Sequence, residues 1–226
     1  MLSPNDNAIA CEKLLASKRA LFIGAHPDDI EFRAGGLVYL MRQRGVEVTF
    51  AIATRGGKGL PLLLRKPVER MRERHQGDAA VVLGGVKVVF FDYPDGNLPA
   101  HVEPLEDDLK ALIADLQPDI ILCWDPEFIS TPHPDHQAAA DAARAATVGM
   151  NVCWYGTMQP NLWVGLDEAA LLMKVRALKA HRTETPWFCF DMRLKKRMIG
   201  AMRQDGSKIG CDYAEAFRFI RPHPQT

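Results

Sequence analysis

The sequence predicts an α/β fold: a Rossmann-like, doubly wound, mostly parallel sheet with helices on both faces. Two observations lead to this prediction. Short apolar runs of strand length alternate along the chain with stretches of helical periodicity, and such alternation is typical of βαβ units with right-handed crossovers. The 226 residues, of which 47% are hydrophobic and 25% charged, also suit a globular chain that buries a core without covalent staples.

The first four elements follow from local patterns. Ala20–Ala25 is an apolar run closed by His-Pro, which predicts a buried strand. Gly35–Arg44 carries apolar residues at helical spacing and is followed by a glycine, a common helix end. Val46–Thr54 alternates and is rich in β-branched residues, so it predicts a second strand. Val68–Leu83 predicts a helix that stops at the glycine pair after it.

The next four elements repeat this order. Val86–Phe91 predicts a third strand, and Leu105–Leu116 predicts a helix that ends before a proline. Asp119–Trp124 is apolar after its first residue and predicts a fourth strand. Asp135–Ala146 is rich in alanine, and the proline before it suits the first turn of a helix.

Beyond about residue 149 the pattern is less regular. Asp167–Ala180 predicts a helix with one apolar face, formed by Leu171, Leu172, Val175 and Leu178. The other expected elements are a strand at Val152–Tyr155, a basic helix at Leu194–Met202 and a final strand at Ala216–Ile220. Because no repeat or flexible linker interrupts the chain, we assign residues 1–226 to a single domain.

Charge and cysteine content restrict the classes of partner. Lys+Arg and Asp+Glu both number 28, so net charge gives no reason to expect nucleic acid or an anionic membrane. The five cysteines form no C-x-x-C pair and predict free thiols in a reducing compartment. The polar start of the chain does not resemble a signal peptide, and no apolar run is long enough to span a membrane. We therefore expect a cytoplasmic protein that acts on a small molecule, with a homo-oligomer left open.

Two clusters of histidine and aspartate carry the candidate chemistry. His26-Pro27-Asp28-Asp29 directly follows the first predicted strand, and His133-Pro134-Asp135-His136 follows the fourth. Ligands of open α/β sheets bind beyond the carboxyl ends of the strands. Both clusters are therefore expected at one edge of the sheet, although more than a hundred residues separate them.

Metal-dependent hydrolysis explains this choice of residue types. A catalytic zinc ion takes three histidine or carboxylate ligands and keeps one position for water, which then ionises near neutral pH. Iron or manganese could occupy the same set of ligands. Taken singly, each cluster also fits a turn whose aspartates cap the following helix; together, at the ends of two strands of one sheet, they favour a metal site. Spacing alone does not tell which histidine of the second cluster binds the metal.

At these residues the chain resembles the PIG-L/LmbE family of zinc-dependent sugar N-deacetylases, whose hallmarks are A-H-P-D-D and H-P-D-H segments. Weaker likenesses continue in the same order from about residue 20 to residue 222. They comprise a T-x-G loop at Thr54–Gly57, a charged helix ending in L-G at Glu69–Leu83, a P-D-G turn at Tyr93–Gly96, an A-H segment at Lys179–Arg182, and an A-E-x-F segment at Tyr213–Phe217.

The resemblance implies a metal set by position. His26, Asp29 and His136 match the family's ligands to zinc, with another divalent ion such as Fe²⁺ as an alternative. The residue after Asp29 is Ile30 where many members have glutamate, which here comes one position later as Glu31. This departure leaves the implied ligands untouched.

The resemblance also implies catalytic roles. Asp28 matches the general base that takes a proton from the metal-activated water. His133 matches the residue that, as imidazolium, stabilises the oxyanion or assists the leaving group, and Asp135 matches its orienting partner. Such a pairing of carboxylate base and cationic donor is chemically coherent.

Arg55, Asp95 and His181 are candidates for substrate contacts, although Arg55 and Asp95 also fit solvated loop charges and His181 also fits a helix end. Thr183 and Glu184 stand where the family often has serine and glutamine, which places substrate contacts there in question. Loops at Arg55–Leu64, Asn97–Glu103 and Met158–Gly165 are expected to select the substrate.

The function implied is hydrolysis of an N-acetyl group from an N-acetylglucosamine-type amino sugar conjugate. Two alternatives remain: an amidohydrolase of another N-acyl substrate, and a non-catalytic sugar-binding module of Rossmann type. The first strand is not followed by G-x-G-x-x-G, so a dinucleotide cofactor is not expected.

Overall fold

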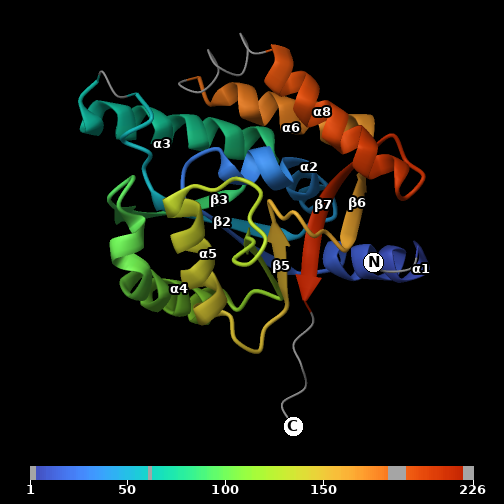
Figure 1. The fold of residues 1–226 in the computed structure, drawn as a ribbon, viewed down its shortest axis with the longest axis horizontal. Helices are drawn as coiled ribbons and strands as arrows, with labels where there is room; N and C mark the ends of the chain where they lie inside the picture. Colours follow the sequence, from blue (N-terminus) through green and yellow to red (C-terminus); the bar gives the residue numbers. More distant parts are fainter. Residues whose placement is uncertain (1–3, 61–62, 183–191, 221–226) are drawn as a thin grey trace.

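The computed structural model describes residues 4–60, 63–182 and 192–220. Its centre is a seven-stranded sheet with the order β3-β2-β1-β4-β5-β7-β6 (Figure 1). The first five strands in this order pair in parallel, and β7 runs antiparallel to both of its neighbours. The prediction of a mostly parallel α/β sheet is therefore confirmed.

The strand cores lie where the apolar runs predicted them, because strands covered on both faces need continuous apolar sequence. β2 and β4 are buried throughout, apart from the first residue of β2. Phe22 and Phe50 pair across β1 and β2 with ring centroids 5.9 Å apart. The strands are β1 Arg19–Gly24, β2 Glu47–Thr54, β3 Lys87–Tyr93, β4 Ile120–Trp124, β5 Val152–Tyr155, β6 Leu162–Leu166 and β7 Tyr213–Ile220.

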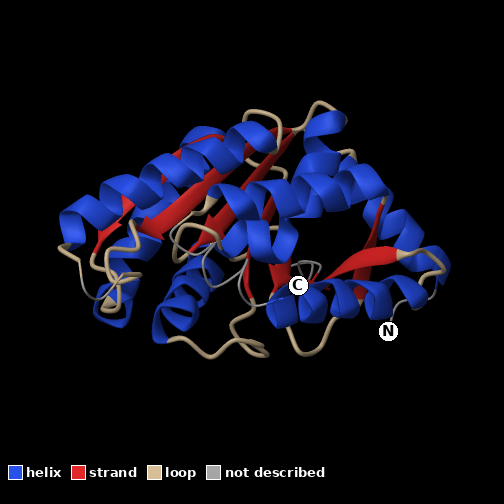
Figure 2. Cartoon of the chain, turned by 90° about the horizontal axis from the view of Figure 1, so that it is seen from above, coloured by secondary structure: helices blue, strands red, loops and turns tan. Residues whose placement is uncertain are grey.

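Helices cover both faces of the sheet (Figure 2). α6 packs on both α2 and α3, and α4 packs on α5. The helices are α1 Pro4–Leu15, α2 Asp29–Gln43, α3 Arg65–Val82, α4 Val102–Leu116, α5 Pro134–Ala146, α6 Glu168–Ala180 and α8 Met192–Ser207, with a short 3₁₀ turn at Leu98–His101. Across the described residues we find no helix with the length and apolarity needed to cross a membrane.

α2 begins six residues before the predicted Gly35, directly after the first histidine cluster. The predicted helix began at the glycine pair, but both glycines lie inside the observed helix. They are needed there because side chains of neighbouring elements approach the helix closely. A β-carbon on Gly36 would overlap the Leu166 side chain, and one on Gly35 would lie 3.2 Å from Lys174. The helix therefore carries Asp29 in its first turn.

Two elements at the amino end and the sheet edge were missed by sequence reasoning. α1 covers β6, where the Asn7 side chain donates to the Trp163 carbonyl at 2.9 Å and accepts from its N–H at 2.8 Å. Leu162–Leu166 was expected within a loop, Met158–Gly165, but it pairs with β7 as an edge strand. That expectation was wrong for these residues, because partner strands far along the chain decide whether so short a segment pairs.

The buried face of α6 also differs from the prediction. Leu172 is 48% exposed, whereas Lys174 is 1% exposed. The Lys174 ammonium donates to Glu215 of β7 at 2.5 Å and to the Phe32 carbonyl at 2.7 Å. A charged residue thus occupies the inward face because its partner is buried with it.

Candidate metal centre and its pocket

The two histidine clusters meet at the carboxyl ends of β1 and β4, which are parallel neighbours in the sheet. The ring centroids of His26, His133 and His136 lie 4.9–5.3 Å apart. Sequence reasoning therefore placed both clusters at the correct edge, and the adjacency of β1 and β4 brings them into contact.

Asp29 is fixed at the turn between β1 and α2. Its Oδ2 accepts from the N–H groups of Ala25 and His26, both at 2.9 Å, and from Nε1 of Trp124 at 3.1 Å. Its Oδ1 lies 3.2 Å from Nε2 of His136. Burial opposes ionisation of this carboxyl, but His136 and His26 outweigh it and hold the pKa of Asp29 below its ordinary range. Asp29 therefore presents its ionised Oδ1 to His136.

His26 and His136 each have one ring nitrogen engaged by an oxygen and the other directed toward Asp29. Nε2 of His26 lies 3.1 Å from the carboxylates of both Asp95 and Asp135, and its Nδ1 lies 3.9 Å from Asp29. Nδ1 of His136 lies 3.3 Å from the Thr131 carbonyl. Such outer partners fix the tautomer of metal-binding histidines. Two groups of the described residues bring together atoms that could hold a divalent ion: His26 with His133 and His136, and His26 with Asp95 and Asp135. Asp29 as a ligand stays a prediction.

The carboxylates around His26 also set its charge. Burial disfavours the imidazolium, but hydrogen bonds with Asp135 and Asp95 prevail and raise the pKa of His26 to about 10. The same hydrogen bond lowers the pKa of Asp95 to about 2, against the opposing effect of burial. Since a metal ligand must be neutral imidazole, a metal ion bound at His26 would displace a proton.

His133 presents an alternative to Asp29 as a ligand. One nitrogen each from His26, His133 and His136 lie within 4.8 Å of one another. However, Nδ1 of His133 accepts the Asp135 N–H at 3.2 Å and so caps α5. This leaves Nε2–H of His133 as a donor, and burial together with repulsion from His26 lowers its pKa. The geometry favours a neutral donor over the imidazolium that the resemblance implied.

Asp135 has a different partner from the one expected. Its carboxylate contacts His26 and accepts the N–H groups of Gly96 at 2.6 Å and Leu98 at 3.1 Å. Its link to His133 runs through its backbone N–H. The Asp135 side chain therefore contacts His26 and the loop after β3, and its role as the orienting partner of His133 stays a prediction. The sequence could not distinguish these partners, since both histidines lie at the same edge.

Asp28 occupies a strained backbone position, with φ 98 and ψ −24 in the left-handed region. Its carboxylate makes no capping hydrogen bond to α2, lies 3.6 Å from the Arg72 guanidinium, and lines the pocket next to Asp29. The backbone is held by Gln76, whose side-chain oxygen accepts the Asp28 N–H at 3.2 Å. The helix-capping interpretation of Asp28 is therefore wrong, and its strain is typical of functional sites.

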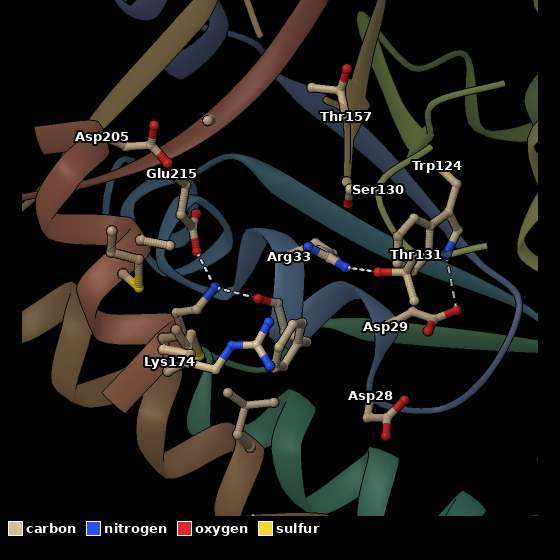
Figure 3. A pocket seen from close by; sticks show the side chains of 18 of the residues that line it. Asp28, Asp29, Arg33, Trp124, Ser130, Thr131, Thr157, Lys174, Asp205 and Glu215 are labelled. Carbon is tan, nitrogen blue, oxygen red and sulfur yellow. Dashed lines mark hydrogen bonds and ion pairs between the residues drawn. The ribbon is translucent and has the colours of Figure 1, made fainter. Parts of the chain in front are cut away.

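A pocket of about 700 Å³ opens beside the cluster (Figure 3). Asp28, Asp29 and His136 line one end, and α6, β7 and α8 line the other. Trp124 joins the two, because its ring stacks on His136 at 4.1 Å and lies under the Arg33 guanidinium at 4.9 Å. Sequence reasoning missed Trp124 and Arg33. Two sequence features could have indicated them: Trp124 ends the predicted strand before the second cluster, and Arg33 stands one helical turn, four residues, after Asp29.

Of the three residues expected to contact substrate, only one lines the pocket. Arg55 pairs with Glu73 and, at 2.6 Å, with Asp92, and it is absent from the pocket lining. Asp95 contacts His26 as described. His181 lines the pocket, is 1% exposed and lies 3.6 Å from Glu31. Substrate contact by these residues stays a prediction, and Thr183, Glu184 and Cys189 lie outside the described residues.

Gly156 allows Trp124 to reach His136. It has φ 64, and a β-carbon there would overlap the Trp124 ring, whereas Gly149 has φ 80 with open space around it. We expect Gly149→Ala to cost about 1 kcal/mol from backbone strain alone. Gly156→Ala should cost roughly 1–3 kcal/mol more because of overpacking. Thermal unfolding of both variants measures the difference; equal losses would show that Trp124 is not confined there.

The segment that carries both clusters has known counterparts. Residues 21–147 match the family model described as PIG-L: GlcNAc-PI de-N-acetylase. Diacetylchitobiose deacetylase of Thermococcus kodakarensis is 25% identical over 90% of this chain and 83% of that protein. A probable N-acetyl-α-D-glucosaminyl L-malate deacetylase 2 of Bacillus cereus is 29% identical, and the match covers 59% of this chain and 62% of that protein. The structure of N,N′-diacetylchitobiose deacetylase from Pyrococcus horikoshii, 25% identical, superimposes with a TM-score of 0.82 over 95% of this chain and 92% of that one.

Proposed function

Because this chain belongs to the PIG-L family of de-N-acetylases, we propose that it is a metal-dependent hydrolase that removes an N-acetyl group from an N-acetylglucosamine-type amino sugar conjugate. The relatives named above are deacetylases of acetylated amino sugars. The observation that carries the proposal is the contact of Asp29 with His136, each of which is held by its own hydrogen bonds. Beside them, the Asp28 carboxylate makes no capping hydrogen bond to α2 and lines the pocket.

We assign His26, Asp29 and His136 as the ligands, and zinc as the ion. The nitrogen and oxygen donors, together with the carboxylate beside His26, suit this choice. When bound, the ion supplies a Lewis acid that polarises the amide carbonyl and makes a nearby water more acidic.

The remaining residues divide the proton transfers and the charge stabilisation. The Asp28 carboxylate accepts a proton from the attacking water and returns it to the amine as the carbon–nitrogen bond breaks and acetate leaves. Nε2–H of His133 donates to the carbonyl oxygen as negative charge grows on it. Asp135 acts through His26 by holding the imidazole in place.

An amidohydrolase of another N-acyl substrate would use the same centre and differ only in the shape of the pocket. A non-catalytic sugar-binding module gives no reason for a carboxylate in a strained backbone position. The assignment of residues 1–226 to one domain, the cytoplasmic location and a homo-oligomer stay predictions.

We expect the purified chain to release acetate from acetylated amino sugars, to lose this activity on removal of metal by a chelator, and to recover it with stoichiometric zinc. Acetate is measured enzymatically for N-acetylglucosamine and diacetylchitobiose, and the freed amine is measured for these sugars and for analogues with longer N-acyl groups. Retention of full activity in metal-free protein would contradict the proposed chemistry. Release from only the longer acyl analogues would favour the other amidohydrolase.

A further inference from the structure

The pocket contains a cation, Arg33, that forms no ion pair with a carboxylate among the residues that the structure describes. Arg33 lies in α2, four residues after Asp29, and lines the pocket beside Trp124 (Figure 3). Within the described residues its only hydrogen bond is from Nη2 to the Thr131 hydroxyl. Its Nε atom is buried without a hydrogen-bond partner. Lys174, which lines the same pocket, instead pairs with Glu215.

The guanidinium is held in a fixed plane. Its central carbon lies 4.9 Å from the centroid of the Trp124 ring and 5.1 Å from that of Phe32. Stacking on aromatic faces and one hydroxyl acceptor orient the group but do not neutralise it. A guanidinium has five N–H donors, so Nη1 and the second hydrogen of Nη2 remain for a ligand.

A half-buried cation that forms no ion pair, as Arg33 is among the described residues, is costly, and an anionic ligand offsets that cost. We propose, building on the proposed deacetylase function, that Arg33 binds a carboxylate or phosphate group of the amino sugar conjugate and so selects anionic substrates. Trp124 contacts both Arg33 and His136. The acetamide therefore lies at the histidine cluster while the anionic group lies on the Arg33 side of Trp124.

The test compares neutral and anionic substrates of one sugar. N-acetylglucosamine is the neutral arm, N-acetylmuramic acid the carboxylate arm, and N-acetylglucosamine 6-phosphate and 1-phosphate the phosphate arms. We expect kcat/KM of the zinc-loaded protein to be at least tenfold higher for one anionic arm than for the neutral arm. Added sodium chloride should reduce this preference, since salt screens the ion pair.

In Arg33→Gln the ratio of anionic to neutral kcat/KM should fall at least tenfold, mainly through a higher KM for the anionic substrate. Arg33→Lys should retain part of a phosphate preference but less of a carboxylate preference, because lysine lacks the planar fork. Arg203→Gln is the matched control. Arg203 of α8 contacts Tyr213 of β7 in an exposed position and is absent from the pocket lining, so the ratio of anionic to neutral kcat/KM should not change.

Binding gives a readout that is independent of turnover. Calorimetry should show glucosamine 6-phosphate or muramic acid binding at least tenfold more tightly than glucosamine, and this difference should disappear in Arg33→Gln. If the wild-type protein deacetylates the neutral sugar and shows no anionic preference in rate or binding, the inference is wrong and the proposed function stands. If no arm releases acetate, the proposed function fails, and the binding difference still decides for or against the anion site.

A purely structural Arg33 predicts another result. Arg33→Gln would then lower the rates on all arms by the same factor and leave the binding ratio unchanged, which would overturn the inference. Circular dichroism and metal content of each variant identify misfolded protein. Where Arg33→Gln fails to fold, the wild-type anionic preference and the fall of the carboxylate preference in Arg33→Lys carry the decision.

Discussion

Replacement of Asp29 by asparagine is expected to abolish metal binding and activity together, whereas His133→Ala should retain the metal. In the native protein, Oδ2 of Asp29 accepts three N–H groups. An asparagine must turn its single oxygen toward these donors and therefore place its NH₂ group where Oδ1 faces His136. An NH₂ group offers no lone pair to a metal.

The same measurement separates the two possible ligand sets. His133 is close enough to His26 and His136 to replace Asp29 as a ligand, but its Nδ1 is used in capping α5. We expect about one zinc per chain in wild type and in His133→Ala, and close to none in Asp29→Asn and His26→Ala. Turnover of His133→Ala should still fall by about 10²–10³, because the oxyanion loses a donor.

Elemental analysis of the folded proteins decides between the sets. Loss of zinc in His133→Ala together with its retention in Asp29→Asn would assign the three histidines as ligands. Asp141→Asn serves as a control, because Asp141 lies on α5 with His136 but pairs with Arg144. It removes a carboxylate from the same helix without touching the cluster.

The elements that the sequence predicted well are those determined by their own residues. Ile120–Trp124 is buried at every position, and its apolar run allows no other placement. The two histidine clusters follow such strands directly, so their common position followed from the rule for parallel sheets. The approach of Asp28, Asp29 and His136 to one pocket was predictable for the same reason.

The elements that were missed depend on partners far along the chain. Lys174 was not expected on the inward face of α6, because only Glu215, 41 residues later, makes its burial tolerable. β6 pairs with β7 across nearly fifty residues, and α1 reaches the same edge through Asn7. The contact of the Asp135 carboxylate with His26 was not predicted, because the chain order does not specify side-chain directions at the edge of a sheet.

Replacement of Asp28 by asparagine is expected to lower turnover by about 10²–10⁴ while zinc content and folding stay near wild type. Asparagine has the shape of aspartate and tolerates the left-handed backbone at φ 98 better than most residues. It keeps the N–H that donates to Gln76 but cannot accept a proton from water. Because the Asp28 carboxylate makes no capping hydrogen bond to α2, the change removes no side-chain cap from the helix.

Asp28→Gly provides the matched comparison. Glycine relieves the backbone strain, which for such positions is roughly 1–3 kcal/mol, so this variant should unfold at a higher temperature than wild type. Its turnover should be as low as that of Asp28→Asn, because both lack the base. If Asp28 is the catalytic base, Asp28→Gly should therefore gain stability while losing turnover. If both variants instead lose stability and keep near wild-type turnover per zinc-loaded, folded molecule, Asp28 serves the fold and the base must be sought among the other carboxylates of the pocket.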